Sequence, residues 1–122
     1  MPLEVQHFDR VPVVRVPLDI DAANAAKVRD ELIGCIGNDA FELIVDLSET
    51  RYLDSAGIDM LFRLNRSLTD RRATLRLVIR PESDLARLAE IVAIPRSIAV
   101  HADVADALEA ATRLRPESHG DV

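Results

Sequence analysis

The fold of this chain is decided by residues 42–62, which read ELIVDLSETRYLDSAGIDMLF. Residues 42–47 form an apolar, β-branched run that is typical of a buried strand, and a polar loop follows it. The sequence Asp-Ser-x-Gly at residues 54–57 then opens a segment with apolar residues at 58, 61, 62 and 68, the spacing of an amphipathic helix. The stretch therefore predicts a strand, a loop and a helix over residues 55–70.

Two roles compete for Ser55 at the start of this helix. Backbone N–H groups lack partners there and the helix dipole is positive, so a phosphate on the serine would be tolerated. The same hydroxyl could also be an ordinary helix cap, which is the commoner role of a serine at this position. The serine follows the carboxyl end of a buried strand, where partner sites of α/β sheets gather, and Ala56 and Gly57 are small enough for another protein to reach it. Both roles stay open at this level.

Strands and helices alternate along the rest of the chain. We expect a hairpin over residues 3–8 and 11–16, further strands at 75–79 and 98–101, and helices from Asp21 or Asn24 to 36, from 82 to 92, and from 103 onward. In the helix over residues 82–92, the side chains expected to face inward are Leu85, Leu88, Ile91 and Val92. This order predicts a single α/β domain with a mixed sheet of four to five strands and about four helices. The domain should span residues 3–114, with a flexible tail at 115–122.

Composition excludes several classes of partner. The chain has 122 residues, which is enough for one domain, and its net charge of −6 makes nucleic acid and anionic membranes poor partners. No apolar run approaches the roughly 20 residues that span a bilayer, and the first residues do not resemble a signal peptide. We therefore expect a cytoplasmic protein. Cys35 is the only cysteine and is expected to be a small core residue.

Motifs for metal binding, nucleotide binding and catalysis are missing from the sequence. The three histidines are isolated, and the four glycines form no phosphate-binding loop. Ser55 has no evident base to activate it as a nucleophile, and carboxylates such as Asp54 and Asp59 stand where helix caps are common. The sequence thus predicts no enzyme activity, no cofactor and no metal.

Two segments of the chain resemble the STAS domains, in particular the stand-alone anti-sigma factor antagonists of bacteria. The stronger one is Leu-Ile-Val-Asp-Leu-Ser at 43–48 followed by Leu-Asp-Ser-Ala-Gly-Ile at 53–58, which is similar to that family's strand, loop and phosphorylation-site helix. In the second, residues 18–24, Asp21 falls on an aspartate that lies near the phosphosite in the family. The sequence departs from the family at Leu18, Ala73 and Ala93-Ile94, which affects turns and leaves the partner's identity open.

The resemblance implies a protein that switches partners. Ser55 would be phosphorylated by an anti-sigma factor serine kinase, and a PP2C-type phosphatase would remove the phosphate. The unphosphorylated form would bind the kinase and release a sigma factor. Residues implied in partner binding are Asp21, Asn24, Asp54, Ser55, Ala56, Gly57 and Asp59. We expect a monomer or weak dimer. The alternatives are a static STAS scaffold, a small-molecule or nucleotide sensor without a phosphoswitch, and an unrelated α/β enzyme.

Overall fold

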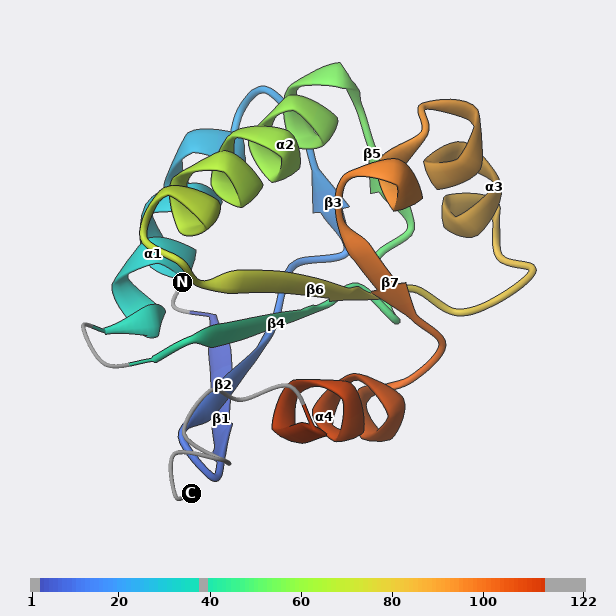
Figure 1. The fold of residues 1–122 in the computed structure, drawn as a ribbon. Coiled ribbons are helices and arrows are strands. Elements are labelled where there is room, and N and C mark those ends of the chain that lie inside the picture. The colour runs from blue at the N-terminus through green and yellow to red at the C-terminus, as the bar shows by residue number, and fades with distance from the viewer. Residues whose placement is uncertain (1–2, 38–39, 114–122) are drawn as a thin grey trace.

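The computed structural model describes residues 3–37 and 40–113, and a five-stranded sheet forms their centre (Figure 1). The strands in spatial order are β1 (Glu4–Phe8), β2 (Val11–Arg15), β4 (Glu42–Asp46), β6 (Thr74–Val78) and β7 (Ala99–His101). β1 and β2 form the predicted antiparallel hairpin, and every later neighbour is parallel. The mixed α/β sheet expected from the sequence is confirmed.

Four helices cover the two faces of this sheet. They are α1 (Ala25–Ile36), α2 (Ser55–Asp70), α3 (Asp84–Ile91) and α4 (Val104–Arg113), and a short 3-10 helix spans Ile94–Arg96. Figure 1 shows α1, α2 and α3 on one face and α4 alone on the other. The arrangement follows from right-handed crossovers between parallel strands, which place the connecting helices against the sheet.

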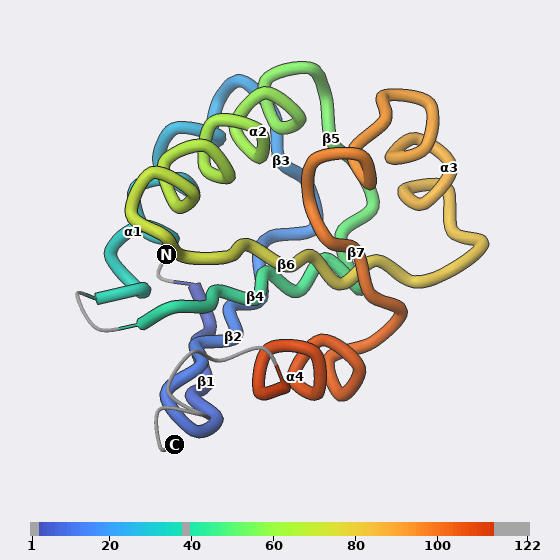
Figure 2. Tube along the Cα trace, in the orientation of Figure 1, coloured from blue at the N-terminus to red at the C-terminus, as the bar shows by residue number. Residues whose placement is uncertain are grey.

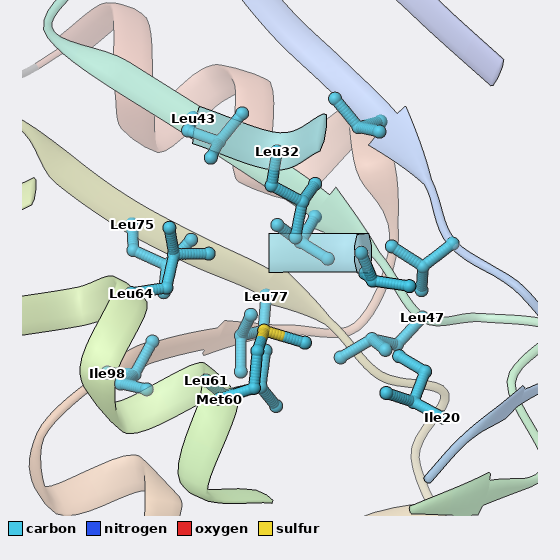
Figure 3. Close-up of a cluster of buried hydrophobic side chains, with 14 of the residues drawn as sticks. Ile20, Leu32, Leu43, Leu47, Met60, Leu61, Leu64, Leu75, Leu77 and Ile98 are labelled. Atoms are coloured by element: carbon cyan, nitrogen blue, oxygen red, sulfur yellow. The ribbon is translucent and has the colours of Figure 1, made fainter. Parts of the chain in front are cut away.

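The main core lies between the sheet and the helices α1 and α2. All five residues of β4 are buried, because this strand has a neighbour on each side and helices on both faces. Leu43 and Val45 of β4 point into the main core, whereas Ile44 packs in the smaller cluster beneath α4. Figure 3 shows the helix side chains of this core, Leu32 of α1 and Leu61 and Leu64 of α2, gathered with the strand side chains Leu43 of β4 and Leu75 and Leu77 of β6.

A second, two-stranded sheet was not anticipated from the sequence. β3 (Asp19–Ile20) and β5 (Tyr52–Leu53) pair in parallel, and Figure 2 shows them side by side near α2. Strands of two residues have no periodicity that could be recognised in a sequence. This small sheet holds together the two loops that follow β2 and β4.

The helix predicted over residues 82–92 is shorter than expected, and one of its side chains was assigned wrongly. The helix begins at Asp84, because the side chain of Ser83 caps it by accepting from the N–H of Ala86 at 3.0 Å. Ile91 was expected to face inward but is 75% exposed, and Ala89 is buried instead. The predicted end of the domain and the tail at 115–122 lie outside the described residues.

A buried ion pair links β4 and β6 on the face of the sheet that α4 covers. The Arg76 guanidinium donates from Nε to Oε1 of Glu42 at 2.8 Å, and both side chains are about 5% exposed. Nη1 of Arg76 lies 3.3 Å from Nε2 of His101, whose Nδ1 lies 2.8 Å from Oδ2 of Asp106 on α4. The network thus joins three neighbouring strands to the helix that covers them.

We predict that Arg76→Ala lowers the free energy of unfolding by about 3–5 kcal/mol, because it removes the buried guanidinium that pairs with the Glu42 carboxylate. The matched control is Arg113→Ala, which breaks an exposed pair with Glu109 at 3.0 Å and should cost at most about 1 kcal/mol. Urea denaturation of the two variants measures both values. Equal losses in the two variants would contradict the structural role given to the buried pair.

Candidate functional site

The predicted site residues gather at one edge of the main sheet. β2 and β4 are parallel, so both end at this edge, and the chain then runs through β3 into α1 and through β5 into α2. The N–H groups of Arg51 and Tyr52 donate to the carbonyl of Leu18 at 2.7 and 3.2 Å. Carboxyl ends of parallel strands are where α/β folds place their binding sites.

Asp54 is the residue that joins the beginnings of the two helices. Its Oδ1 accepts from the N–H of Gly57 at 3.0 Å, which makes it the N-cap of α2. Its Oδ2 accepts from the N–H of Ala22, just before α1, at 3.2 Å. Its own N–H donates to the carbonyl of Ile20 at 3.2 Å. One carboxylate therefore fixes the first turn of α2 against the segment that leads into α1.

Ser55 is the first residue of α2, and its side chain is exposed. The hydroxyl makes no hydrogen bond to any described residue, because the capping position belongs to Asp54. The interpretation of Ser55 as the helix cap is therefore wrong. The prediction that Ser55 lies in the first helical turn and is open to solvent is confirmed.

Asp21 and Asn24 build the turn that precedes α1. Oδ1 of Asp21 accepts from the N–H of Ala23 at 2.9 Å, and Oδ1 of Asn24 accepts from the N–H of Asp21 at 2.9 Å. Nδ2 of Asn24 also donates to the carbonyl of Asp19 at 3.0 Å. Both polar side chains are half-buried and hold the loop in shape, while their role in binding a partner stays a prediction.

Gly57 permits the close approach of α2 to β3. A Cβ atom at this position would lie 2.9 Å from the carbonyl oxygen of Ile20 and 3.0 Å from Cδ2 of Leu53. Real Cβ atoms essentially never come as close to another heavy atom as the 2.9 Å that separates this one from the Ile20 oxygen. The glycine of the Asp-Ser-x-Gly sequence is therefore required by packing, and its removal should displace the turn that presents Ser55.

Ala56 and Asp59 line a groove between the first turns of α1 and α2. The groove has a volume of about 390 Å³, and Ala22, Ala25 and Arg29 line it from the α1 side. Asp59 is exposed and pairs with Arg63, whose Nε lies 2.6 Å from its Oδ2. The fold thus brings all seven predicted partner-binding residues to the beginnings of the same two helices.

The site offers acceptors and an exposed hydroxyl but no cluster suited to a metal. Residues 3–37 and 40–113 contain no group of three or more His, Cys, Asp or Glu side chains placed to hold a metal ion.

Burial, and to a smaller extent the carboxylate of Glu31, raise the pKa of the half-buried Cys35 thiol, which lowers the reactivity of that thiol at neutral pH. None of the helices in the described ranges is long and apolar enough to cross a membrane.

Comparison with protein-family models matches residues 2–107 of this chain to the STAS domain. Among solved structures, an anti-sigma factor antagonist from Mycobacterium paratuberculosis superposes with a TM-score of 0.79 at 23% identity, covering 90% of this chain and 92% of that one. An anti-sigma-factor antagonist (STAS) domain protein from Planctomyces limnophilus gives a TM-score of 0.77 at 16% identity, covering 92% and 99%.

A third similar structure is the Bacillus cell fate determinant SpoIIAA in its phosphorylated form. It superposes with a TM-score of 0.63 at 15% identity, covering 93% of this chain and 99% of that one. At these identities the three structures establish the shared fold.

We predict that Asp54→Ala and Ser55→Ala affect stability very differently. The first removes the N-cap and should lower the free energy of unfolding by about 0.5–2 kcal/mol. The second removes an exposed hydroxyl and should change that free energy by no more than about 0.5 kcal/mol. Urea denaturation of both variants provides the comparison. A larger loss for Ser55→Ala than for Asp54→Ala would show that the capping assignment is wrong.

Gly57→Ala should lower the free energy of unfolding by about 1–3 kcal/mol, because the new methyl group overpacks against the carbonyl of Ile20. Gly34→Ala is the matched control, since Gly34 is an exposed glycine of α1 with open space around it. There the same change should raise stability by up to about 1 kcal/mol through helix propensity. Thermal melts should therefore shift in opposite directions for the two variants, and shifts of the same sign would contradict the packing role of Gly57.

Proposed function

The chain belongs to the STAS domain family, and from this we propose that it is an anti-sigma factor antagonist controlled by phosphorylation of Ser55. The observation that supports the proposal is the division of roles at the start of α2, where Asp54 caps the helix and the neighbouring hydroxyl stays exposed. The names of the similar structures, which include antagonists and a phosphorylated SpoIIAA, agree with it.

In the proposed cycle the unmodified protein binds an anti-sigma factor serine kinase and thereby frees a sigma factor. The kinase transfers the γ-phosphate of ATP to Oγ of Ser55, so the hydroxyl loses its proton and ADP leaves. The phosphorylated protein dissociates, and a PP2C-type phosphatase hydrolyses the phosphoester with water. The protein itself acts by binding rather than by catalysis, and the cytoplasm stays its predicted location.

Phosphorylation at this position should leave the fold intact. The phosphate adds about −1.5 to −2 charges at neutral pH, next to a helix N-terminus whose dipole favours negative charge by about 0.3–1 kcal/mol. The hydroxyl makes no hydrogen bond with residues 3–37 and 40–113, so phosphorylation breaks none among them. The modification therefore alters the surface of the protein without requiring a refolding step.

The same phosphate charge would weaken binding to a partner that presents a negative charge to Ser55. A carboxylate of the partner about 6 Å away, at an effective dielectric constant near 40, would repel a phosphate of about two charges by roughly 2–3 kcal/mol. That energy corresponds to a loss of affinity of about 30- to 150-fold. Asp21 and Asp54 already accept backbone hydrogen bonds, so the phosphate would be the main new acceptor of the site.

We predict that Ser55→Ala still binds the anti-sigma factor kinase but accepts no phosphate, whereas Ser55→Glu binds more weakly. The glutamate carries about half the charge of a phosphate, so its effect should be smaller than that of phosphorylation. Each anti-sigma factor kinase encoded in the same genome is purified and tested for binding by calorimetry and for phosphate transfer by mass spectrometry of the Ser55 peptide. Thermal melts control for folding.

Two results would contradict the phosphoswitch. Equal affinity of the kinase for the wild type, Ser55→Ala and Ser55→Glu, with intact melts, would identify the protein as a static binding module. Phosphate on any serine or threonine other than Ser55, with Ser55→Ala still modified, would place the switch elsewhere.

A further inference from the structure

The helix α4 is attached to the sheet by a smaller apolar contact than α2 is. It packs against β2, β4, β6 and β7, and its buried side chains are those of Ala107 and Ala111, with Val104 and Leu108 half-buried beside them. By contrast, α2 buries Met60 and three leucines in the main core. Because an alanine contributes a single methyl group, apolar packing by itself holds α4 less firmly than α2.

A polar contact supplements this packing at the first turn of α4. Oδ2 of Asp106 lies 2.8 Å from Nδ1 of His101 on β7, and Nε2 of the same ring lies 3.3 Å from Nη1 of Arg76 on β6. The backbone N–H of Asp106 also donates to Oδ1 of Asp103 at 2.8 Å, which holds this turn in place. We call Asp106, His101 and Arg76 the α4 relay.

The chemistry of the α4 relay determines which ring nitrogen of His101 carries the proton. An arginine guanidinium only donates hydrogen bonds, so Nε2 of His101 must accept from Arg76. A neutral imidazole whose Nε2 is an acceptor carries its proton on Nδ1, and that N–H then donates to the Asp106 carboxylate. The side chain of His101 is 12% exposed, so the protein supplies most of its surroundings. The α4 relay is thus a directed chain of hydrogen bonds from β6 to the helix.

We propose that α4 is a releasable cover of the sheet, fastened by the α4 relay, and that it opens while the rest of the domain stays folded. Local opening of this kind takes place where few buried apolar contacts have to be broken. The main core is left intact, because the buried side chains beneath α4 form a separate cluster. Release would uncover the strand residues of that cluster, which are Val11, Val13, Ile44 and Val78.

This opening concerns a different part of the molecule from the start of α2. Figure 1 shows α4 alone on one face of the sheet and α2, which begins at Ser55, on the other. The inference is therefore independent of the proposed role of Ser55.

Native-state hydrogen exchange of the full-length protein, followed by NMR, measures the opening of α4 and of the sheet separately. The amides of Ala107 and Leu108 in α4 should have protection factors at least about tenfold lower than those of Ile44 and Val45 in β4. Ile36→Val trims a buried side chain of the main core, so it should lower the protection of β4 at least about threefold. It should leave the protection of α4 within about 1.5-fold, because release of α4 does not expose residue 36.

Variants of the α4 relay test how the helix is fastened. Asp106→Ala should lower the protection of α4 at least about fivefold, because it removes the acceptor of the His101 ring. The matched control is Glu109→Ala, which removes an exposed α4 carboxylate that pairs with Arg113 and should change the protection by no more than about twofold. His101→Ala breaks the same contact, so the double variant should lose at least about threefold less than the product of the two single losses. Ring ¹⁵N shifts should place the proton of neutral His101 on Nδ1.

Three results would overturn the inference. Equal protection of α4 and β4 in the wild type, lowered together by Ile36→Val, would mean that α4 opens only when the whole domain unfolds. Losses for Asp106→Ala and His101→Ala that simply multiply in the double variant would mean that their contact does not fasten the helix. A proton on Nε2 of neutral His101 would contradict the direction of the hydrogen bonds in the α4 relay. Thermal melts establish that each variant is folded before its exchange is measured.

Discussion

The parallel pairing of β2 with β4 is the constraint on which the rest of the structure depends. Because the two strands end at the same edge of the sheet, the segments that follow them must lie side by side, and β3 and β5 pair there. The crossover helices α1 and α2 then begin next to each other. Burial of β4 on both faces fixes its register, since a slip of one residue would exchange Ile44 with its neighbours between the two cores.

Asp54 and Ser55 are neighbours with different roles: Asp54 caps α2, and Ser55 presents an exposed hydroxyl. The carboxylate of Asp54 supplies the hydrogen bonds that hold both helix beginnings. A serine used as the cap would have its hydroxyl oxygen engaged by a backbone N–H group. Because the cap is the preceding residue, the exposed hydroxyl of Ser55 takes no part in capping the helix, and Gly57 rather than Ser55 makes the close contact with Ile20. The residue that stabilises the start of the helix and the residue whose hydroxyl is accessible are therefore adjacent but different.

The carboxylates around Ser55 are less available to a partner than the sequence suggests. Asp21 and Asp54 accept backbone N–H groups, and Asp59 pairs with Arg63. Their charges are thus partly compensated within the molecule. A new phosphate would have no such compensation from these residues, so it would dominate the local field that an approaching protein meets.

The sequence by itself determined the elements with strong periodicity. The hairpin, the buried strand at residues 42–46 and the helix from Ser55 to Asp70 follow from alternation, β-branching and the apolar stripe, which are local properties of the chain. The exposed place of Ser55 at the start of its helix was predictable for the same reason. Only the tertiary structure decided that Asp54 also accepts from the segment before α1, that Ile91 faces solvent, and that the backbones of Leu18 and Tyr52 are joined. These features depend on contacts between segments about 30 residues apart, or on where a helix ends against its neighbours, and local patterns do not encode either.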